Sequence, residues 1–275
     1  MVLLDLLAKL PDIKSIVAHY DHGIRPDSKA DRLFVKKMAK AYGLPFVYDQ
    51  GKLGPKASEA EARVARYSFL EKTRQASGAR AVVTAHHQDD QLETAFINTI
   101  RGTGRRGITA LRNRPTMMRP LLNIPKRELV AHAQSNGLKW REDSTNQDTR
   151  YLRNSIRLKI LPLLAQTDLD QLTSGLRELS VTNDQIDKLL INHLHTQTTA
   201  GQLDRYWFNM LPHMVATEIM SIWLRSHGIA NLDKKRIEML TTKARILPDG
   251  KSIVMDSSHS IKVGKRQLAL TVAER

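Results

Sequence analysis

The chain has 275 residues, which is enough for one large domain or two ordinary ones, and a hydrophobic content of 41% excludes a disordered protein. It has no cysteine, so disulfides, thiolate metal sites and thiol nucleophiles are excluded. The net charge of +15 is uneven, because residues 101–162 carry 14 basic and only 4 acidic side chains. This concentration favours contact with a polyanion over a merely solvated basic face. The sequence has no membrane-length apolar run and no leader pattern, which predicts a soluble, cytoplasmic protein.

The first half of the chain alternates short apolar runs with amphipathic helical patterns. Such alternation predicts a parallel sheet with helices on both faces. One helix has clear ends, because Ser58 and Glu61 form a capping box at its start and Gly78 follows its last turn. In chain order, the expected elements are a helix at 1–10, a strand at 13–19, a helix at 27–42, a strand at 44–48, a helix at 58–77, a strand at 79–85, a helix at 90–100, a strand at 117–122 and a helix at 125–136.

The second half of the chain is mainly helical. A basic helix is expected at 150–164, with further helices within 169–195 and 212–245. Two β-rich segments, 252–255 and 267–272, flank turn-like polar residues near the end. We therefore expect an α/β catalytic domain over residues 1–165, followed by a smaller helical domain over 166–275 that ends in a β-hairpin.

A polar cluster follows the buried strand expected at 79–85 and opens the next helix. It contains His86, His87, Asp89, Asp90 and Glu93. In open parallel sheets, ligands bind beyond the carboxyl ends of the strands, so this position predicts a binding or catalytic site. Two other interpretations remain: an aspartate that only caps the helix beside ordinary histidines, and a metal site made of histidine and aspartate.

Another polar loop and one inward arginine add to this prediction. The loop His19–Arg25 follows the strand expected at 13–19 and is expected at the same edge of the sheet, although such a loop is often merely a turn. Its Gly23 permits a tight turn and close approach to a ligand. Arg66 lies within the apolar stripe of the helix at 58–77, so its side chain is predicted to point inward. A buried arginine needs a partner, either a carboxylate or a phosphate.

Two basic segments are candidates for phosphate contact. The loop at 101–107 combines glycines with arginines, but it lacks the lysine and hydroxyl of a Walker P-loop and is unspecific by itself. In the basic helix, Arg150, Arg153 and Arg157 share one face at i, i+3 and i+7 spacing.

Taken together, these segments resemble the tRNA(Ile)-lysidine synthase family of the PP-loop ATP pyrophosphatases, over about residues 1–165. The histidine–aspartate cluster together with the arginine–asparagine helix is the most specific part of the resemblance. The matching segments are His19-x-Asp21-His22-Gly23, Glu61-Ala62-Arg63-x-x-Arg66-Tyr67, Ala85-His86-His87-x-Asp89-Asp90-Gln91-x-Glu93-Thr94, Arg101-Gly102-x-Gly104, Arg119-Pro120-Leu121-Leu122, Trp140-x-Glu142-Asp143-Ser144-x-Asn146 and Arg153-Asn154-x-Ile156-Arg157.

The resemblance implies a ligase that uses ATP and Mg²⁺ to adenylate the wobble cytidine of tRNA(Ile) with a CAU anticodon, and then joins free L-lysine to it. It implies a catalytic set of Arg66, His86, Asp89, Asp90 and Glu93. Residues expected on the ATP and lysine side are His19, Asp21, His22, Gly23, Arg25, Arg101 and Gly102. Residues expected to contact tRNA are Arg105, Arg106, Arg119, Lys126, Arg127, Arg150, Arg153, Arg157 and Lys159. No dedicated metal site is expected, and Mg²⁺ would enter with ATP, with Asp89 and Asp90 as its candidate protein ligands.

One departure from the family pattern is large. The pyrophosphate loop Ser-Gly-Gly-x-Asp-Ser, which lies between the first strand and first helix of the family, does not occur in this sequence. The simplest interpretation is a sequence that begins at an internal methionine. The alternatives are a catalytically inactive RNA-binding homologue and another PP-loop tRNA-modifying enzyme. A homodimer is compatible with the resemblance, and no membrane partner is expected.

Overall fold

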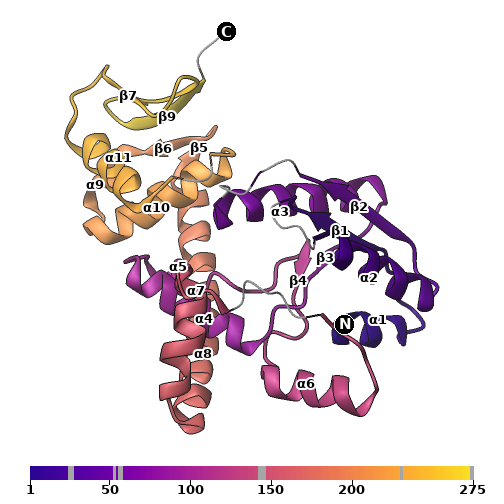
Figure 1. Ribbon diagram of the computed structural model, residues 1–275. Helices are drawn as coiled ribbons and strands as arrows, with labels where there is room; N and C mark the ends of the chain where they lie inside the picture. The colour runs from indigo at the N-terminus through magenta and orange to yellow at the C-terminus, as the bar shows by residue number, and fades with distance from the viewer. Residues whose placement is uncertain (24–27, 52–53, 55–57, 142–146, 230–231, 273–275) are drawn as a thin grey trace. The chain divides into compact units, whose positions relative to one another are not determined.

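The computed structural model describes residues 1–23, 28–51, 54, 58–141, 147–229 and 232–272. The chain forms two compact units, each described by itself below (Figure 1). Unit 1 comprises Met1–Arg101 and Ile108–Ser174, and unit 2 comprises Gly102–Gly107 and Gly175–Arg275. None of the described helices is long and apolar enough to cross a membrane.

Unit 1 contains two parallel strand pairs. Strand β1 (Val17–Asp21) pairs with β2 (Phe46–Gln50), from Val17 opposite Phe46 to Asp21 opposite Gln50. Strand β3 (Val82–Val83) pairs with β4 (Met117–Met118). Both β1 and β3 contact helix α3 (Glu59–Ala76), yet no ladder joins the two pairs within the part of the chain that the structure describes. The sheet is therefore parallel, as expected, but divided into two halves.

The helices of unit 1 follow the sequence pattern closely. They are α1 (Val2–Ala8), α2 (Ser28–Ala41), α3, α4 (Gln88–Ile100) and α6 (Lys126–Ser135). The predicted capping box of α3 is confirmed: the Glu61 amide donates to Ser58 Oγ at 3.2 Å, and the Ser58 amide donates to Glu61 Oε2 at 2.8 Å. After α3, Gly78 adopts a φ of 66°, which an L side chain would resist, so the helix ends there.

The basic segment at 150–164 is less regular than the continuous helix that the sequence predicts. It consists of α7 (Leu152–Ser155), a π-helical segment (Ile156–Ile160) and a 3₁₀ turn (Leu161–Leu163). The π-helical hydrogen bond runs from the Leu161 amide to the Ile156 carbonyl. Pro162 has no amide hydrogen to continue an α-helix, which explains the change of geometry at this end.

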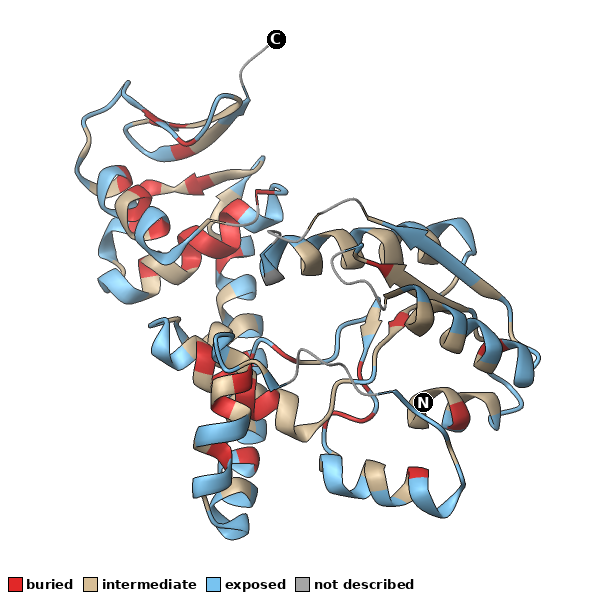
Figure 2. Cartoon of the chain, in the orientation of Figure 1, coloured by how far each residue is buried: buried red, intermediate tan, exposed pale blue. Residues whose placement is uncertain are grey.

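Unit 2 holds the continuous hydrophobic core of the protein. Its helices are α9 (Arg205–Met210), α10 (His213–Ser226), α11 (Lys234–Ile246) and most of α8 (Gln166–Thr196), with the short α5 (Arg105–Ile108) mostly in this unit. Trp223 and Phe208 are almost fully buried and pack with Leu240 and Ile261. The buried residues are concentrated on α10 in this unit (Figure 2).

The C-terminal β region is larger than the expected hairpin. An antiparallel sheet has the order β5 (Thr198–Thr199), β6 (Gln202–Asp204), β9 (Gln267–Val272), β8 (His259–Val263) and β7 (Ser252–Val254). The two strands predicted from the sequence, β7 and β9, both pair with β8 rather than with each other. In β8, polar His259 and Lys262 mask the strand pattern, although Ile261 and Val263 point into the core.

Candidate functional site

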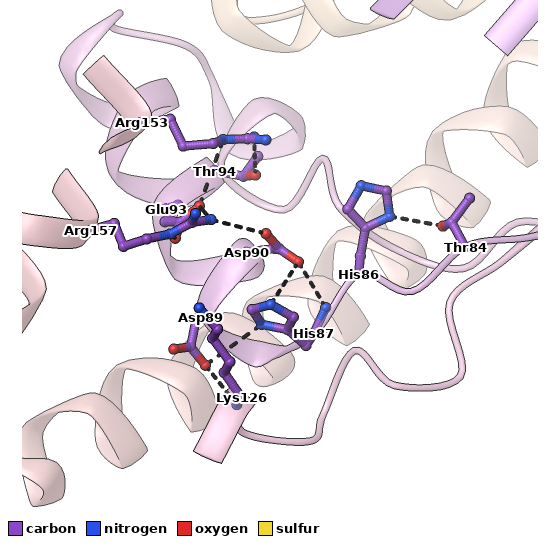
Figure 3. Close-up of polar contacts among 10 residues, drawn as sticks. All are labelled: Thr84, His86, His87, Asp89, Asp90, Glu93, Thr94, Lys126, Arg153 and Arg157. Carbon is purple, nitrogen blue, oxygen red and sulfur yellow. Dashed lines mark hydrogen bonds and ion pairs between the residues drawn. The ribbon is translucent and has the colours of Figure 1, made fainter. Parts of the chain in front are cut away.

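The predicted polar cluster lies where β3 ends and α4 begins (Figure 3). The chain passes from Val83 through Thr84 and His86 directly into the first turn of α4. That first turn carries Asp89 and Asp90, and carboxylates are stabilised there by the unpaired amides and the helix dipole. Glu93 follows one turn later on the same side as Asp90, because i and i+3 positions are neighbours on a helix.

Glu93 is held by an arginine from the basic segment. Its side chain is fully buried, and its two carboxylate oxygens accept from Arg157 Nε at 2.6 Å and from Arg157 Nη2 at 2.9 Å. Arg153 Nε lies 3.7 Å from Glu93 Oε2. Burial raises the pKa of Glu93 and the nearby Asp90 charge adds to this, whereas the hydrogen bond from Arg157 opposes both.

Asp90 faces two groups at once. Its Oδ2 accepts from the His87 backbone amide at 3.0 Å and lies 3.4 Å from His87 Nε2. Its Oδ1 lies 3.6 Å from Arg157 Nη2. One oxygen therefore caps the first turn of α4, as the capping interpretation expects, while the other points to the same guanidinium that holds Glu93.

Asp89 points away from Asp90 and serves a neighbouring helix. Its Oδ1 accepts from the Lys126 amide at 3.0 Å, at the start of α6, and lies 3.7 Å from His87 Nδ1. Burial acts to raise the pKa of Asp89, whereas the nearby His87 ring and the hydrogen bond from the Lys126 amide lower it. Asp89 thus ties α4 to α6.

His86 is neutral near pH 7. Its Nδ1 shares a hydrogen bond of 2.8 Å with Thr84 Oγ1. Burial, followed by the positive charges of Arg119, Arg63 and Arg66, lowers the pKa of His86 to about 4, against the opposing effect of Asp90. Thr84 is not among the residues predicted from the sequence, although a hydroxyl directly after the apolar residues 81–83 is a signal that could have identified it.

Arg66 points inward from α3, as predicted, and no carboxylate of the described residues pairs with it. Its guanidinium lies 5.4 Å from the ring centroid of Tyr67, and that of Arg63 lies 4.8 Å from the same ring. Burial lowers the pKa of Arg66, and the charges of Arg63 and Arg153 lower it further. Of the two partners that the sequence left open for Arg66, the structural ion pair is absent from the described residues.

The loop after β1 is built around Asp21. This carboxylate is buried and accepts from the Gly23 amide at 3.0 Å. Gly23 has a φ of 66°, and a Cβ there would lie 2.5 Å from the Gly51 carbonyl oxygen, so only glycine fits. The His22 ring packs edge-on against Tyr20 at 5.0 Å, and burial lowers the pKa of His19. Arg25, the remaining predicted residue of this loop, lies outside the described residues.

The glycine–arginine loop at 101–107 is not part of the cluster. Arg101 caps the carboxyl end of α4, about 16 Å along the helix axis from Asp90 by helix geometry. Gly102 follows it with a φ of 66°. Within unit 2, Arg105 Nη2 donates to Asp187 Oδ1 at 2.6 Å and Arg106 Nη2 donates to the same oxygen at 2.8 Å.

The residues predicted to contact tRNA divide into two groups. Those with exposed side chains are Lys126, Arg127, Arg150 and Lys159, and of these Arg150 also donates to Asp148 at 2.7 Å. Those held by other groups of the protein are Arg105, Arg106, Arg119, Arg153 and Arg157. Arg119 is buried and donates to the Arg112 carbonyl.

A protein-made metal centre does not form among the residues that the structure describes. No group of three or more histidine and acidic side chains gathers there with the spacing of ligands. Asp89 and Asp90, the candidate ligands for Mg²⁺, both approach the His87 ring, at 3.7 and 3.4 Å, and otherwise contact Lys126 and Arg157 respectively (Figure 3).

Comparison with known proteins shows to which family the chain belongs. The sequence model of the PP-loop domain matches residues 1–164. The chain therefore belongs to the PP-loop family. The predicted resemblance to tRNA(Ile)-lysidine synthases is confirmed. The protein of that name from Thermus thermophilus is 41% identical over 172 residues, which covers 60% of this chain and 34% of the relative.

Two further similarities extend this comparison. The tRNA(Ile)-lysidine synthase of Burkholderia mallei is 31% identical over 260 residues, which covers 88% of this chain and 53% of the relative. The chain thus spans between about a third and about half of the length of these relatives. A solved structure of a U34-tRNA thiolase from Methanococcus maripaludis aligns with a TM-score of 0.51 and 17% identity, covering 65% of this chain and 67% of that one. That similarity concerns the fold alone.

Proposed function

We propose that the chain carries the catalytic domain of an ATP-dependent tRNA-modifying ligase that joins free L-lysine to C2 of the wobble cytidine in tRNA(Ile) with a CAU anticodon. One observation carries this proposal. Groups that suit an anion, Arg66 and neutral His86, stand beside groups that suit a cation, Asp90 and Glu93. A reaction that joins a nucleotide phosphate to an amine needs both kinds of group in one place.

Arg66 and His86 form the anion-binding side of the proposed site. A guanidinium without a carboxylate among the described residues suits a phosphate, which it can bind through two parallel hydrogen bonds. His86 remains neutral at pH 7, so its ring can accept or donate one hydrogen bond without a charge of its own. In the proposed first step, the C2 oxygen of cytidine attacks the α-phosphorus of ATP and pyrophosphate leaves.

Asp90 and Glu93 form the cation-binding side. In the proposed second step, the lysine amine attacks C2, AMP leaves with the C2 oxygen, and the nitrogen loses a proton. Asp90 is the better placed of the two to contact the amine, because it is slightly exposed whereas Glu93 is fully buried. A carboxylate at that point orients the amine and receives its proton.

The nucleotide would bring its own metal ion. Because Asp89 and Asp90 point apart and Asp89 is engaged with α6, they do not fit a shared Mg²⁺ site. No step of the proposal therefore depends on a protein-bound metal.

The tRNA surface is proposed for the exposed basic side chains of unit 1. Lys126 and Arg127 lie at the start of α6, and Arg150 and Lys159 flank the basic segment. Phosphate contacts of such residues release counterions, so RNA affinity is expected to fall steeply with salt.

A direct test of the proposal replaces the carboxylate nearest the amine. Asp90→Asn keeps the shape and the capping oxygen but removes the charge, so lysine incorporation into a CAU tRNA should fall about 10²- to 10³-fold, as for other transition-state contacts. The assay uses radiolabelled lysine and the chain extended at its amino end by a strand and a Ser-Gly-Gly-x-Asp-Ser loop of the family pattern. Asp49→Asn, at the exposed strand β2, is the matched control. An Asp90→Asn protein with more than about half of the activity would exclude this role.

A second candidate is a catalytically inactive RNA-binding protein of the same family. The engagement of both Glu93 oxygens by Arg157 favours it, because this carboxylate is then already paired within the protein. It predicts tight, salt-dependent tRNA binding with no AMP formation, either with or without the added loop. AMP formation by the extended chain separates the two candidates.

A further inference from the structure

A single guanidinium contacts both carboxylates of the cation-binding side. Arg157, in the π-helical segment Ile156–Ile160, binds both oxygens of Glu93 at 2.6 and 2.9 Å and lies 3.6 Å from Asp90 Oδ1 (Figure 3). Both carboxylates belong to the first two turns of α4. In this structure the two cation-binding carboxylates are therefore paired with a cation of the protein itself, the Arg157 guanidinium.

The two carboxylates require a cation at this position. Glu93 is fully buried, and its pKa is raised first by that burial and then by the Asp90 charge. A buried carboxylate without a counter-charge costs several kcal/mol of stability by the usual desolvation penalty. Removing Arg157 would leave Glu93 with only the longer contact to Arg153 at 3.7 Å, so a second cation that takes its place at the same time favours the exchange.

A primary ammonium is a suitable replacement. It carries the same single charge and three donors, so it can satisfy oxygens of both Glu93 and Asp90. Because Arg157 already binds both Glu93 oxygens and lies 3.6 Å from Asp90 Oδ1, a substrate ammonium at this position competes with the guanidinium. Arg157 is therefore the closest internal occupant of the cation site, with Arg153 Nε at 3.7 Å from Glu93 Oε2, and the substrate ammonium is its external competitor.

Arg157 also has an alternative partner available. Its side chain is about one quarter exposed, and Arg150 and Lys159 of the same segment are exposed. An RNA that binds this basic segment brings phosphates within reach, and a phosphate binds a guanidinium as well as a carboxylate does. π-helical turns such as this one often occur at functional sites.

We propose that Arg157 is an internal stand-in for the substrate ammonium, and that an RNA phosphate releases it so that free lysine binds Asp90 and Glu93. This inference rests on the proposed function, because it takes the lysine amine as the external cation. It goes further in making lysine binding depend on RNA binding. The exchange also keeps the buried Glu93 paired at every stage.

The proposal predicts a measurable coupling between two ligands. RNA should tighten lysine binding by about 5- to 150-fold, the usual range for coupled sites, and lysine should tighten RNA binding by the same factor, as thermodynamic linkage requires. Without Arg157, lysine should bind tightly whether or not RNA is present.

The experiment measures lysine affinity by equilibrium dialysis with radiolabelled L-lysine, with and without a saturating CAU anticodon stem–loop RNA. The proteins are the unmodified chain, Arg157→Gln and Arg157→Lys, with Arg80→Gln as the control for loss of one exposed arginine of unit 1. We expect Arg157→Gln to bind lysine without RNA about as tightly as the unmodified chain does with RNA. Arg80→Gln should keep the full coupling.

Arg157→Lys guards against a failure of the glutamine variant to fold. It retains the charge but loses the two parallel hydrogen bonds, so its coupling should be smaller than that of the unmodified chain. Circular dichroism establishes that each variant is folded. Weaker lysine binding in a folded Arg157→Gln protein, or an unchanged coupling in Arg157→Lys, would overturn the inference alone. Absence of lysine binding to the amino-terminally extended chain in the presence of RNA would overturn the proposed function as well.

Discussion

Arg66 illustrates how far a single residue can be interpreted from the sequence. Its position in the apolar stripe of α3 predicts an inward side chain, and helical periodicity alone is enough for that prediction. The sequence leaves its partner open, because a carboxylate or a phosphate serves equally well. Within the described residues, the structure surrounds it with Tyr67 and further arginines rather than with a carboxylate.

A partly buried arginine without a carboxylate partner among the described residues is expected to lower the stability of the fold while it strengthens anion binding. Arg66→Met should unfold at the same or a higher temperature, because it removes a desolvated charge that lacks a counter-ion among the described residues. Its affinity for pyrophosphate and for AMP should fall about 10- to 100-fold, the usual effect of losing a charged hydrogen bond. Differential scanning calorimetry and isothermal titration calorimetry measure the two effects.

The matched control for Arg66 is Arg74, on the same helix. Arg74 is paired with Glu71 at 2.6 Å, so Arg74→Met should leave anion affinity unchanged. A lower unfolding temperature of Arg66→Met together with unchanged affinity would mean that Arg66 has a structural role only.

At the scale of elements, the segment Gly102–Gly107 has a different role in the structure from the one that its sequence predicts. As a sequence it combines glycines and arginines in the manner of a phosphate-binding loop. In the structure it belongs to unit 2, where Asp187 on α8 accepts from Arg105 and Arg106, and Glu218 on α10 accepts from Arg105 at 3.0 Å. The arginines therefore anchor this segment to two helices of unit 2.

This anchor makes a prediction about stability. Asp187→Ala should lower the free energy of unfolding by about 2–4 kcal/mol, because two partly buried guanidinium groups lose their shared carboxylate. Glu178→Ala, at an exposed position of the same helix, should change it by no more than about 0.5 kcal/mol. Urea unfolding followed by circular dichroism provides the measurement. Equal effects of the two substitutions would show that the ion cluster adds nothing to stability.

At the scale of the whole molecule, hydrophobic packing is uneven. The continuous core belongs to unit 2, whereas the strands β1 and β2 of unit 1 have only one buried residue, Asp21. Large apolar side chains near these strands, including Ile16 and Val47, remain exposed. The β1–β2 and β3–β4 pairs also share no ladder within the described residues. Among the strands that the structure describes, β1 therefore pairs only with β2, and β3 only with β4.

The division between β1 and β3 predicts the effect of one added strand. A strand and Ser-Gly-Gly-x-Asp-Ser loop placed before Met1 should pair with β1 and β3, because α3 already covers both. Each backbone group of these partly buried strands that gains a partner should contribute about 0.5–1.5 kcal/mol to stability. We expect the extended chain to be monomeric and to release pyrophosphate from ATP, and the 275-residue chain to do neither well.

Size-exclusion chromatography and a pyrophosphate-release assay, applied to both chains, test this expectation. A control extension of the same length with serine and glycine only should not rescue either property. Monomeric, active behaviour of the 275-residue chain would contradict the prediction and would require another phosphate site.

The sequence by itself determined the local features of this protein. Hydrophobic periodicity, the Ser58–Glu61 capping box and the stops at glycine depend on residues a few positions apart, so they can be predicted without a fold. The order of these elements also placed the polar cluster at the end of a parallel strand. The PP-loop resemblance followed from contiguous motifs of the same kind.

Only the tertiary structure decided which charged groups are partners. Arg157 and Glu93 are 64 positions apart, and Arg105 and Asp187 are 82 positions apart. No local pattern distinguishes such pairs from the many other arginines and carboxylates of a basic chain, because packing of distant helices selects them. For the same reason the partner of β9 could not be predicted: a strand pattern specifies which face is buried, whereas the neighbouring strand is chosen when the core assembles.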